Sequence, residues 1–256
     1  MLPSLLLVDD EEEILEFLER TLNSQYSILK AANGKEALRV LETEVVQLVV
    51  SDVMMPEMDG FELCKVIKST VAHSHLPVIL LTAKNSIQAK VEGLELGADA
   101  YIEKPFSKAH LLAQISSLLY NRNMIREFFA SSPLVHIKSM AHTRSDEQFL
   151  TTLHNIISKY LGDEEFDVEK LAKIMMMSRV TLYRKIKAVS DLSPLELINI
   201  SRLKRAAELL TSGEYRISEI SAMVGFSSQS NFARSFQKQF NMTPTDYMQS
   251  KQASSQ

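Results

Sequence analysis

The chain has 256 residues, of which 45% are hydrophobic and 23% charged, as expected of a globular protein with two domains. It contains no apolar run near the ~20 residues of a membrane-spanning helix, no basic signal-peptide start and one cysteine, so we expect a cytoplasmic protein without disulfides, structural metal or membrane contact by this segment. The net charge of −4 is uneven, because residues 1–122 carry 11 basic and 18 acidic side chains whereas residues 170–256 carry 13 and 6, which favours polyanion contact by the second half alone.

Five short apolar runs in the first half alternate with segments whose apolar residues recur at helical spacing. This alternation predicts βα units around a parallel sheet. Runs that are apolar throughout are typical of strands buried on both faces. We therefore predict an α/β domain with a doubly wound, five-stranded parallel sheet. The expected strands are residues 5–8, 26–31, 48–51, 78–81 and 100–102.

Polar side chains follow four of these strands, at the point where each strand ends. They are Asp9 and Asp10, Asp52, Thr82 and Lys104. In an open parallel sheet, ligands bind beyond the carboxyl ends of the strands, so we expect these side chains to converge. Three carboxylates would raise one another's pKa unless a cation compensated them, and Mg²⁺ prefers oxygen ligands. Lys104 and the Thr82 hydroxyl suit a phosphoryl group, as a charge and a donor.

Four motifs surround these residues: LVDDE at 7–11, SDVMMPEMDG at 51–60, LTA at 81–83 and GADAYIEKPF at 97–106. Over about the first 120 residues, the chain resembles the receiver domain of two-component response regulators, which has a flavodoxin-like fold. The resemblance implies that Asp52 accepts a phosphoryl group from a histidine kinase, as the nucleophile of an acyl-phosphate-forming reaction. It also implies a cis peptide bond before Pro105.

The same resemblance assigns the remaining roles at this site. Asp10, Asp52 and the backbone carbonyl of Met54 would bind Mg²⁺, with Asp9 assisting through water. Lys104 would hold the phosphate. Thr82 and Tyr101 would form a switch pair, in which the hydroxyl moves to the phosphate and the aromatic ring turns inward.

The second half begins with residues 123–145, a poorly periodic stretch that we predict to be a linker. In the following domain, residues 146–256, a first helix is expected to start at a Ser145 cap and to stop near Gly162. From Asp167 onward the sequence repeats with an offset of 49 and then 50 residues. Each copy reads as a short helix, a tight turn, a serine cap and a second helix, which predicts two helix-turn-helix units at about 167–190 and 216–240.

The turns of the two units differ. Gly225 can take a positive φ in the second turn, whereas Met176 occupies the equivalent position in the first. The first turn is therefore either strained or of another type. Between the units, a helix of about 16 residues would span roughly 24 Å and could hold the two recognition helices about one DNA turn apart. On that helix, Arg202, Lys204 and Arg205 either contact phosphates or stay in water.

Helical geometry places polar side chains of each second helix opposite its apolar, inward face. Taken singly, each is as well explained by a solvated surface, but matching faces in two copies favour contact with base edges and phosphates. In the first unit the predicted DNA-facing residues are Arg179, Val180, Thr181, Tyr183, Arg184 and Lys187. In the second unit they are Gln229, Ser230, Asn231, Arg234 and Gln237.

The stretch 166–248 resembles the DNA-binding domain of AraC-type transcription regulators, most closely over ISEISAMVGFSSQSNFARSF at 217–236 and NMTPTDY at 241–247. A receiver joined to such a domain is similar to the C-terminal part of hybrid two-component regulators of Bacteroidetes-type bacteria. By that resemblance, the kinase acts in trans or lies in the same parent chain, and Met1 need not be a natural start.

We therefore predict a sequence-specific DNA-binding transcription regulator that is controlled by phosphorylation of Asp52. Its expected partners are DNA, a histidine kinase and, when phosphorylated, a second copy of itself. We expect no enzymatic activity beyond phosphorylation and dephosphorylation of the chain itself. Two alternatives stay open: a constitutive DNA-binding protein that uses the first domain only to dimerise, and a phosphorelay intermediate.

Overall fold

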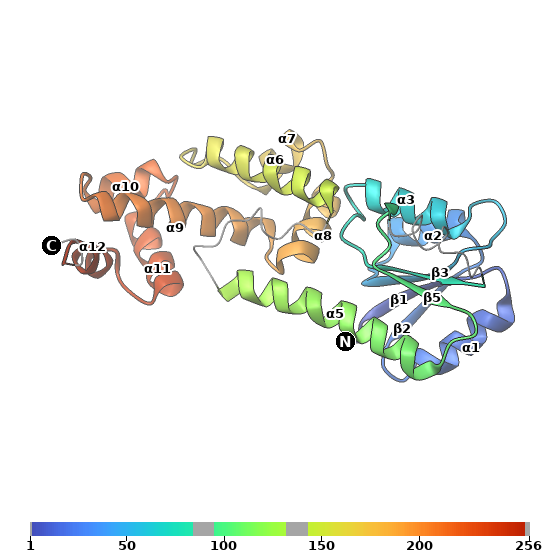
Figure 1. The fold of residues 1–256 in the computed structure, drawn as a ribbon. Coiled ribbons are helices and arrows are strands. Elements are labelled where there is room, and N and C mark those ends of the chain that lie inside the picture. Colours follow the sequence, from blue (N-terminus) through green and yellow to red (C-terminus); the bar gives the residue numbers. More distant parts are fainter. Residues whose placement is uncertain (1, 84–94, 132–142, 254–256) are drawn as a thin grey trace. The chain divides into compact units, whose positions relative to one another are not determined.

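The computed structural model describes residues 2–83, 95–131 and 143–253 (Figure 1). The chain forms two compact units, which are described separately. The first consists mainly of Met1–Ile125 and includes His142–Asp146, and the second consists mainly of Glu147–Gln256. Within the described residues, no helix combines the length and the hydrophobicity that a bilayer crossing requires.

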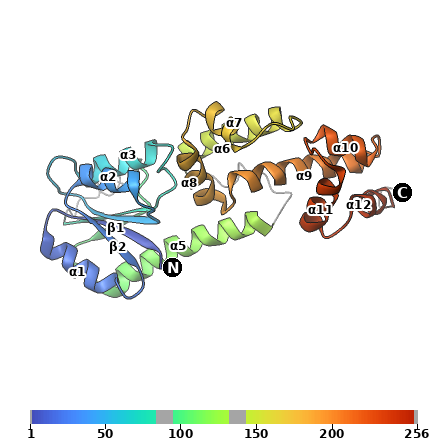
Figure 2. The same ribbon diagram turned by 180° about the vertical axis from the view of Figure 1, so that it is seen from behind.

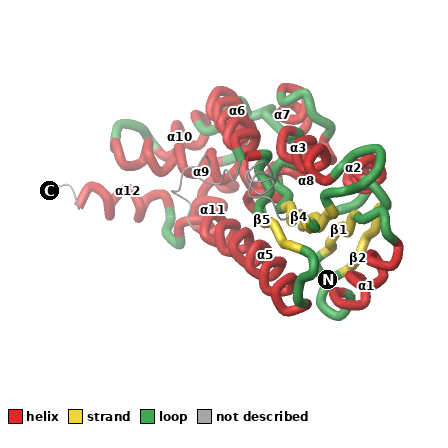
Figure 3. Tube along the Cα trace, turned by 45° about the vertical axis from the view of Figure 1, so that its right-hand side comes forward, coloured by secondary structure: helices red, strands yellow, loops and turns green. Residues whose placement is uncertain are grey.

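The first unit contains a five-stranded sheet in which every strand pair is parallel (Figure 3). The strand order is β2-β1-β3-β4-β5, which confirms the predicted doubly wound, flavodoxin-like sheet. The strands are β1 (Ser4–Val8), β2 (Ser27–Ala31), β3 (Leu48–Asp52), β4 (Val78–Thr82) and β5 (Ala100–Glu103). Asp52 and Thr82 are the last residues of their strands, and Asp9 and Lys104 directly follow theirs, so all four lie at one edge of the sheet.

Helices cover both faces of this sheet (Figures 1 and 2). They are α1 (Glu12–Leu22), α2 (Gly34–Thr43), α3 (Gly60–Ser69) and α5 (Lys108–Ser131). Side chains alternate across β1, so Leu6 packs with α2 and α3 on one face while Leu5 packs with α1 and α5 on the other. Two apolar layers therefore hold the strands from both sides, as the uninterrupted apolar runs predict.

The second unit is helical and has two apolar cores. Its helices are α6 (Arg144–Tyr160), α7 (Val168–Ile174), α8 (Arg179–Ser190), α9 (Pro194–Ser212), α10 (Ile217–Met223), α11 (Gln229–Phe240) and α12 (Pro244–Ala253). The first core lies among α6, α7, α8 and the start of α9, and the second lies among the rest of α9, α10 and α11. A capping box between Ser193 and Glu196 begins α9, and Gly213 in the left-handed conformation ends it.

Two local features differ from what the sequence indicates. Helix α6 begins at Arg144, because the Thr143 hydroxyl accepts a hydrogen bond from the Asp146 amide at 3.0 Å, so the prediction of Ser145 as the cap is wrong. Helix α5 extends to Ser131 and so includes part of the segment assigned to a linker. The first helix-turn-helix turn is the strained alternative, since Met176 has φ 53° where Gly225 has φ 75°.

Candidate functional site

Three polar side chains meet at the carboxyl edge of the sheet. Asp9 and Asp52 are buried, with exposed fractions of 1% and 6%. The Nζ atom of Lys104 lies 2.5 Å from Oδ1 of Asp52 and 3.0 Å from Oδ2 of Asp9. The Lys104–Pro105 peptide bond is cis, as the resemblance implies. One ammonium group therefore pairs with two carboxylates that come from different strand ends, which leaves a net negative charge.

The pKa values at this site follow from burial and from the shared charge. Burial raises the pKa of Asp9, and hydrogen bonds from the Glu11 amide and from Lys104 only partly oppose this, while the charge of Asp52 raises it further. Partial burial lowers the pKa of Lys104, but its hydrogen bonds to Asp52 and Asp9 outweigh this, so the pKa of Lys104 is raised above its ordinary value. Lys104 is therefore a permanent cation at this edge.

The main chain fixes the position of Asp52. Its Oδ2 atom accepts a hydrogen bond from the Met54 amide at 2.6 Å, and the Ser51 hydroxyl donates to its backbone carbonyl at 2.8 Å. A Cβ atom at Gly60 would lie 2.1 Å from that same carbonyl oxygen, so no other residue fits there without displacing the end of β3. The loop after Asp52 thus folds back against the strand that carries it.

The other predicted site residues differ in burial and in their place along the strands. Thr82 is fully buried at the end of β4, adjacent to β3 in the sheet. Tyr101 packs against the core on the α2 and α3 face, and its hydroxyl has no hydrogen-bond partner in the described part of the chain. Asp10 and Met54 are exposed. The structure thus brings Asp9, Asp52 and Lys104 into direct contact and leaves Asp10 at the solvent side.

The donor atoms at this edge suit magnesium. They are carboxylate and carbonyl oxygens, which hard divalent cations prefer, and the repulsion between Asp9 and Asp52 favours a compensating cation. Among the described residues, no three or more His, Cys, Asp or Glu side chains are already grouped as metal ligands. The residues therefore fit Mg²⁺ by donor chemistry and charge.

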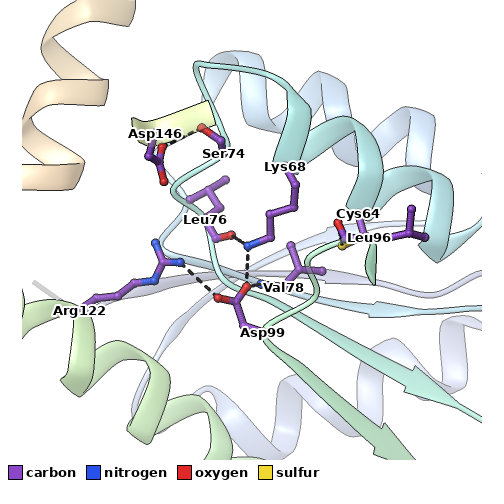
Figure 4. Close-up of polar contacts among 9 residues, drawn as sticks. All are labelled: Cys64, Lys68, Ser74, Leu76, Val78, Leu96, Asp99, Arg122 and Asp146. Atoms are coloured by element: carbon purple, nitrogen blue, oxygen red, sulfur yellow. Dashed lines mark hydrogen bonds and ion pairs between the residues drawn. The ribbon is translucent and has the colours of Figure 1, made fainter. Parts of the chain in front are cut away.

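A second charged cluster lies at the opposite edge of the sheet, where β4 and β5 begin (Figure 4). Asp99 accepts hydrogen bonds from the Val78 amide at 2.8 Å and from Lys68 Nζ at 2.5 Å, and Arg122 lies 3.4 Å away. Lys68 also donates to the Leu76 carbonyl at 2.7 Å. Burial lowers the pKa of Lys68, and Asp99 opposes that shift. No sequence motif indicates this cluster, because its members are far apart in the chain.

Helix α8 carries a mixed set of predicted DNA-facing residues. Val180 and Tyr183 are large apolar side chains that are 60% and 49% exposed. Arg179 lies 3.5 Å from Glu169, and Lys187 lies 3.0 Å from Asp191, so both cations have partners on the protein. Thr181 belongs to the helix cap, since its amide donates to Ser178 Oγ at 3.0 Å, and Arg184 is half-buried.

On helix α11, unlike α8, every predicted DNA-facing residue is polar. Its predicted DNA-facing residues Gln229, Ser230, Asn231, Arg234 and Gln237 are all exposed. The Arg234 side chain makes no hydrogen bond or ion pair with the described residues. The opposite face is locked by aromatic contacts, with Phe236 ring centroids 4.5 Å from Phe240 and 5.4 Å from Tyr247. A rigid helix thus offers a free guanidinium to a ligand.

The three cations of α9 have different surroundings. Arg202 is buried and donates to backbone carbonyls, so contact with a phosphate is excluded for it. Lys204 is half-buried, and burial lowers its pKa. Arg205 is exposed and lies 2.7 Å from Glu208. The sequence could not separate these residues, because the three lie within a single helical turn.

Known protein families match the sequence of each of the two compact units. The chain matches the model of the response regulator receiver domain over residues 5–116 and that of a helix-turn-helix domain over residues 171–250. Response regulator GtcR of Aneurinibacillus migulanus is 35% identical over 191 residues, which is 72% of this chain and 75% of that protein. Histidine kinase P4 of Formosa agariphila is 41% identical over 244 residues, which is 95% of this chain. The signal receiver domain of a signal transduction histidine kinase from Syntrophus aciditrophicus is 37% identical, with a TM-score of 0.45 over 46% of this chain and 91% of that structure.

The fold and the charged edge of the sheet define a receiver domain, and it is followed by an AraC-type helix-turn-helix domain. The chain belongs to the response regulators of two-component systems. It spans only 18% of the length of the Formosa relative. Both matched domains are signalling and DNA-binding domains rather than enzyme families.

Proposed function

We propose that phosphoryl transfer to Asp52 controls sequence-specific DNA binding by helices α8 and α11. The observation that carries this proposal is the position of Lys104 Nζ between two buried carboxylates at the carboxyl edge of the sheet. Such an arrangement holds a carboxylate nucleophile beside a fixed cation, as phosphoryl transfer requires.

In the proposed reaction, an Asp52 carboxylate oxygen attacks the phosphorus of a phosphohistidine, and the imidazole nitrogen leaves with the electron pair of the broken P–N bond. Lys104 then neutralises a phosphoryl oxygen in place of part of its present contact with the carboxylates. Asp9, Asp10, Asp52 and the Met54 carbonyl would hold Mg²⁺, which when bound supplies positive charge to the phosphoryl oxygens. The chain promotes its own phosphorylation and dephosphorylation and is otherwise not an enzyme.

The output depends on a population shift. Thr82 and Tyr101 form the switch pair, and the phosphate favours the state in which the Thr82 hydroxyl contacts it. We propose that this state associates as a homodimer in the cytoplasm. The donor is a histidine kinase, in trans or in the same parent chain. The proposed division is a receiver domain at 1–122, a connecting segment at 123–145 and a DNA-binding domain at 146–256.

The proposed DNA contacts are divided between the two helix-turn-helix units. On α8 we propose Arg179, Val180, Thr181, Tyr183, Arg184 and Lys187. On α11 we propose Gln229, Ser230, Asn231, Arg234 and Gln237. The exposure of the α11 set supports base reading by this helix, whereas the exposed positive charges of Arg179 and Lys187 suit phosphate contacts on α8.

The test is a titration of the full chain with acetyl phosphate and Mg²⁺, followed by binding to a duplex that the chain has selected from a random pool. We expect the apparent affinity to change with the fraction of phosphorylated Asp52 and the Asp52→Asn variant to be insensitive to the donor. Unchanged affinity at full phosphorylation would point to a constitutive regulator. Rapid passage of the phosphoryl group to a histidine-containing transfer domain, without any effect on DNA, would point to a phosphorelay intermediate.

A further inference from the structure

Arg202 occupies an unusual position for a cation in a DNA-binding unit. It lies in the middle of α9 and is 8% exposed. Its guanidinium donates three hydrogen bonds to backbone carbonyls: Nε to Leu161 at 3.3 Å, and Nη2 to Asp163 at 2.7 Å and to Phe166 at 3.4 Å. These three acceptors belong to the segment between α6 and α7. One side chain of α9 therefore fixes that segment, and its planar fork suits several acceptors at once.

The same segment meets the turn of the second helix-turn-helix unit. A Cβ atom at Gly225 would lie 2.6 Å from the Leu161 carbonyl oxygen and 3.0 Å from Nη2 of Arg202. A Cβ atom at Gly162 would lie 2.8 Å from the Met223 carbonyl oxygen. Gly162 in the α6–α7 segment and Gly225 in the α10–α11 turn thus allow the two backbones to approach each other more closely than a residue with a side chain would permit.

Apolar packing also joins the two helix-turn-helix units at this point. Leu161 precedes the first helix-turn-helix unit in sequence, but it packs against the apolar core of the second, as Ile217 and Phe226 do. The contact between the two helix-turn-helix units therefore includes an apolar side chain, two close backbone contacts at glycines and one buried guanidinium. It adds a second connection to the covalent one through α9.

We infer that Arg202 is a positioning residue for DNA binding, which braces the α6–α7 segment against the α10–α11 turn and so presents α8 and α11 as one rigid pair. This inference rests on the proposed function. With the brace intact, binding of one recognition helix places the other at a fixed distance and orientation, which raises its effective concentration at the adjacent site. Without the Arg202 contacts, α9 alone fixes the distance and orientation of α11 relative to α8.

Arg205 provides a matched control. It lies on the same helix and carries the same charge, but it is exposed and contacts only Glu208 among the described residues. Arg202→Met and Arg205→Met therefore remove the same charge from the same helix, and only the first removes the brace. Arg202→Lys keeps the charge without the three-acceptor fork, so it tests whether geometry or charge matters.

The first measurement needs no DNA. Spin labels at Lys173→Cys on α7 and Lys238→Cys on α11, both exposed positions, report the distance between the units by electron–electron double resonance. The native Cys64 is buried, and burial raises the pKa of its thiol to about 11, so the label goes to the introduced cysteines. We expect a narrow distance distribution in the parent chain and in Arg205→Met, and a broad one in Arg202→Met. An equally narrow distribution in Arg202→Met overturns the inference.

The second measurement uses the selected duplex with base pairs inserted between its two contacted segments. We expect an insertion of about five base pairs, half a helical turn, to lower the affinity of the parent chain at least about tenfold. Arg202→Met should bind the uninserted duplex about tenfold more weakly and should lose most of this spacing dependence, while retaining its affinity for either segment alone. Equal loss on the separate segments would overturn the inference, since it would show a local folding effect.

The outcomes separate the inference from the function on which it rests. If the chain selects no duplex, the proposed function fails and the distance measurement still decides the brace. If Arg202→Met does not fold, Arg202→Lys and the spacing dependence of the parent chain decide it. A parent chain that tolerates the half-turn insertion overturns the brace even though it binds DNA.

Discussion

Lys104 Nζ lies 2.5 Å from Oδ1 of Asp52, at the point where the chain would receive a phosphoryl group. The same ammonium holds Asp9 at 3.0 Å, so its removal leaves two buried carboxylates without their cation. We expect Lys104→Gln to lower the rate of Asp52 phosphorylation by acetyl phosphate by about 10²-fold, as the loss of one preorganised charge at a transition state does. The rate is measured by intact-protein mass spectrometry. Lys108→Gln, an exposed lysine of α5, is the control, and an unchanged rate in Lys104→Gln would remove Lys104 from the mechanism.

Removal of Mg²⁺ tests whether the proposed reaction at Asp52 requires the cation. Chelation by EDTA should abolish phosphorylation of Asp52 and leave the fold intact by circular dichroism, and added Mg²⁺ should restore the reaction. In the absence of phosphodonor, Mg²⁺ should raise the melting temperature of the parent chain, because it binds the folded state. Asp10→Asn should reduce that shift. Full phosphorylation of Asp52 in EDTA would show that Lys104 suffices without the cation.

Arg234 offers the simplest test of DNA reading. Its side chain is exposed and has no partner in the described part of the chain, so Arg234→Ala removes no contact within the fold. We expect a loss of about 1–3 kcal/mol in binding to the selected duplex if the side chain reads a base, with little change in binding to random DNA. Lys238→Ala on the same helix is the control. Wild-type affinity in Arg234→Ala would mean that another face of α11 meets the groove.

The sequence predicted the strand ends and the two helix-turn-helix units because both depend on local pattern. Asp52 and Lys104 could be assigned to one edge, since parallel strands share their carboxyl ends. The Lys68–Asp99 pair and the buried state of Arg202 could not be predicted. Both depend on contacts between residues 31 or more positions apart, and a lysine or arginine in a helix is usually solvated.

Lys68 and Asp99 show how much such a hidden contact contributes. Lys68 is 8% exposed, and its removal leaves Asp99 with the Val78 amide and with Arg122 at 3.4 Å. We expect Lys68→Met to lower the free energy of unfolding by about 1.5–3 kcal/mol, the usual contribution of hydrogen bonds to a charged group. Urea unfolding measures it. The double variant Lys68→Met with Asp99→Leu should recover part of the loss, and a double variant less stable than the single would contradict this account.

Glu196 gives a pH-dependent contribution to stability. The Ser193 amide and hydroxyl donate to its carboxylate, and these hydrogen bonds lower its pKa below the ordinary 4.5. Because the folded pKa is the lower one, the contribution is present above about pH 4.5 and is lost as pH falls through the folded pKa. Glu196→Gln should therefore be less stable than the parent by about 0.5–1 kcal/mol at pH 7, a modest value for an exposed cap. The difference should shrink below pH 4.5, and a difference that stays constant with pH would exclude the carboxylate as its source.

The close approach of Gly60 to the carbonyl oxygen of Asp52 sets the mutational tolerance of this protein in an unexpected place. Gly60 bears no reacting group, yet a single added methyl at this position displaces the strand end that carries Asp52, the proposed phosphoacceptor. In a saturation library scored for signalling, position 60 should be as intolerant as Asp52 itself, whereas the exposed Met54, two residues from the nucleophile, should accept many side chains. Loss of signalling in a natural variant can therefore originate in the main chain while every catalytic side chain remains present.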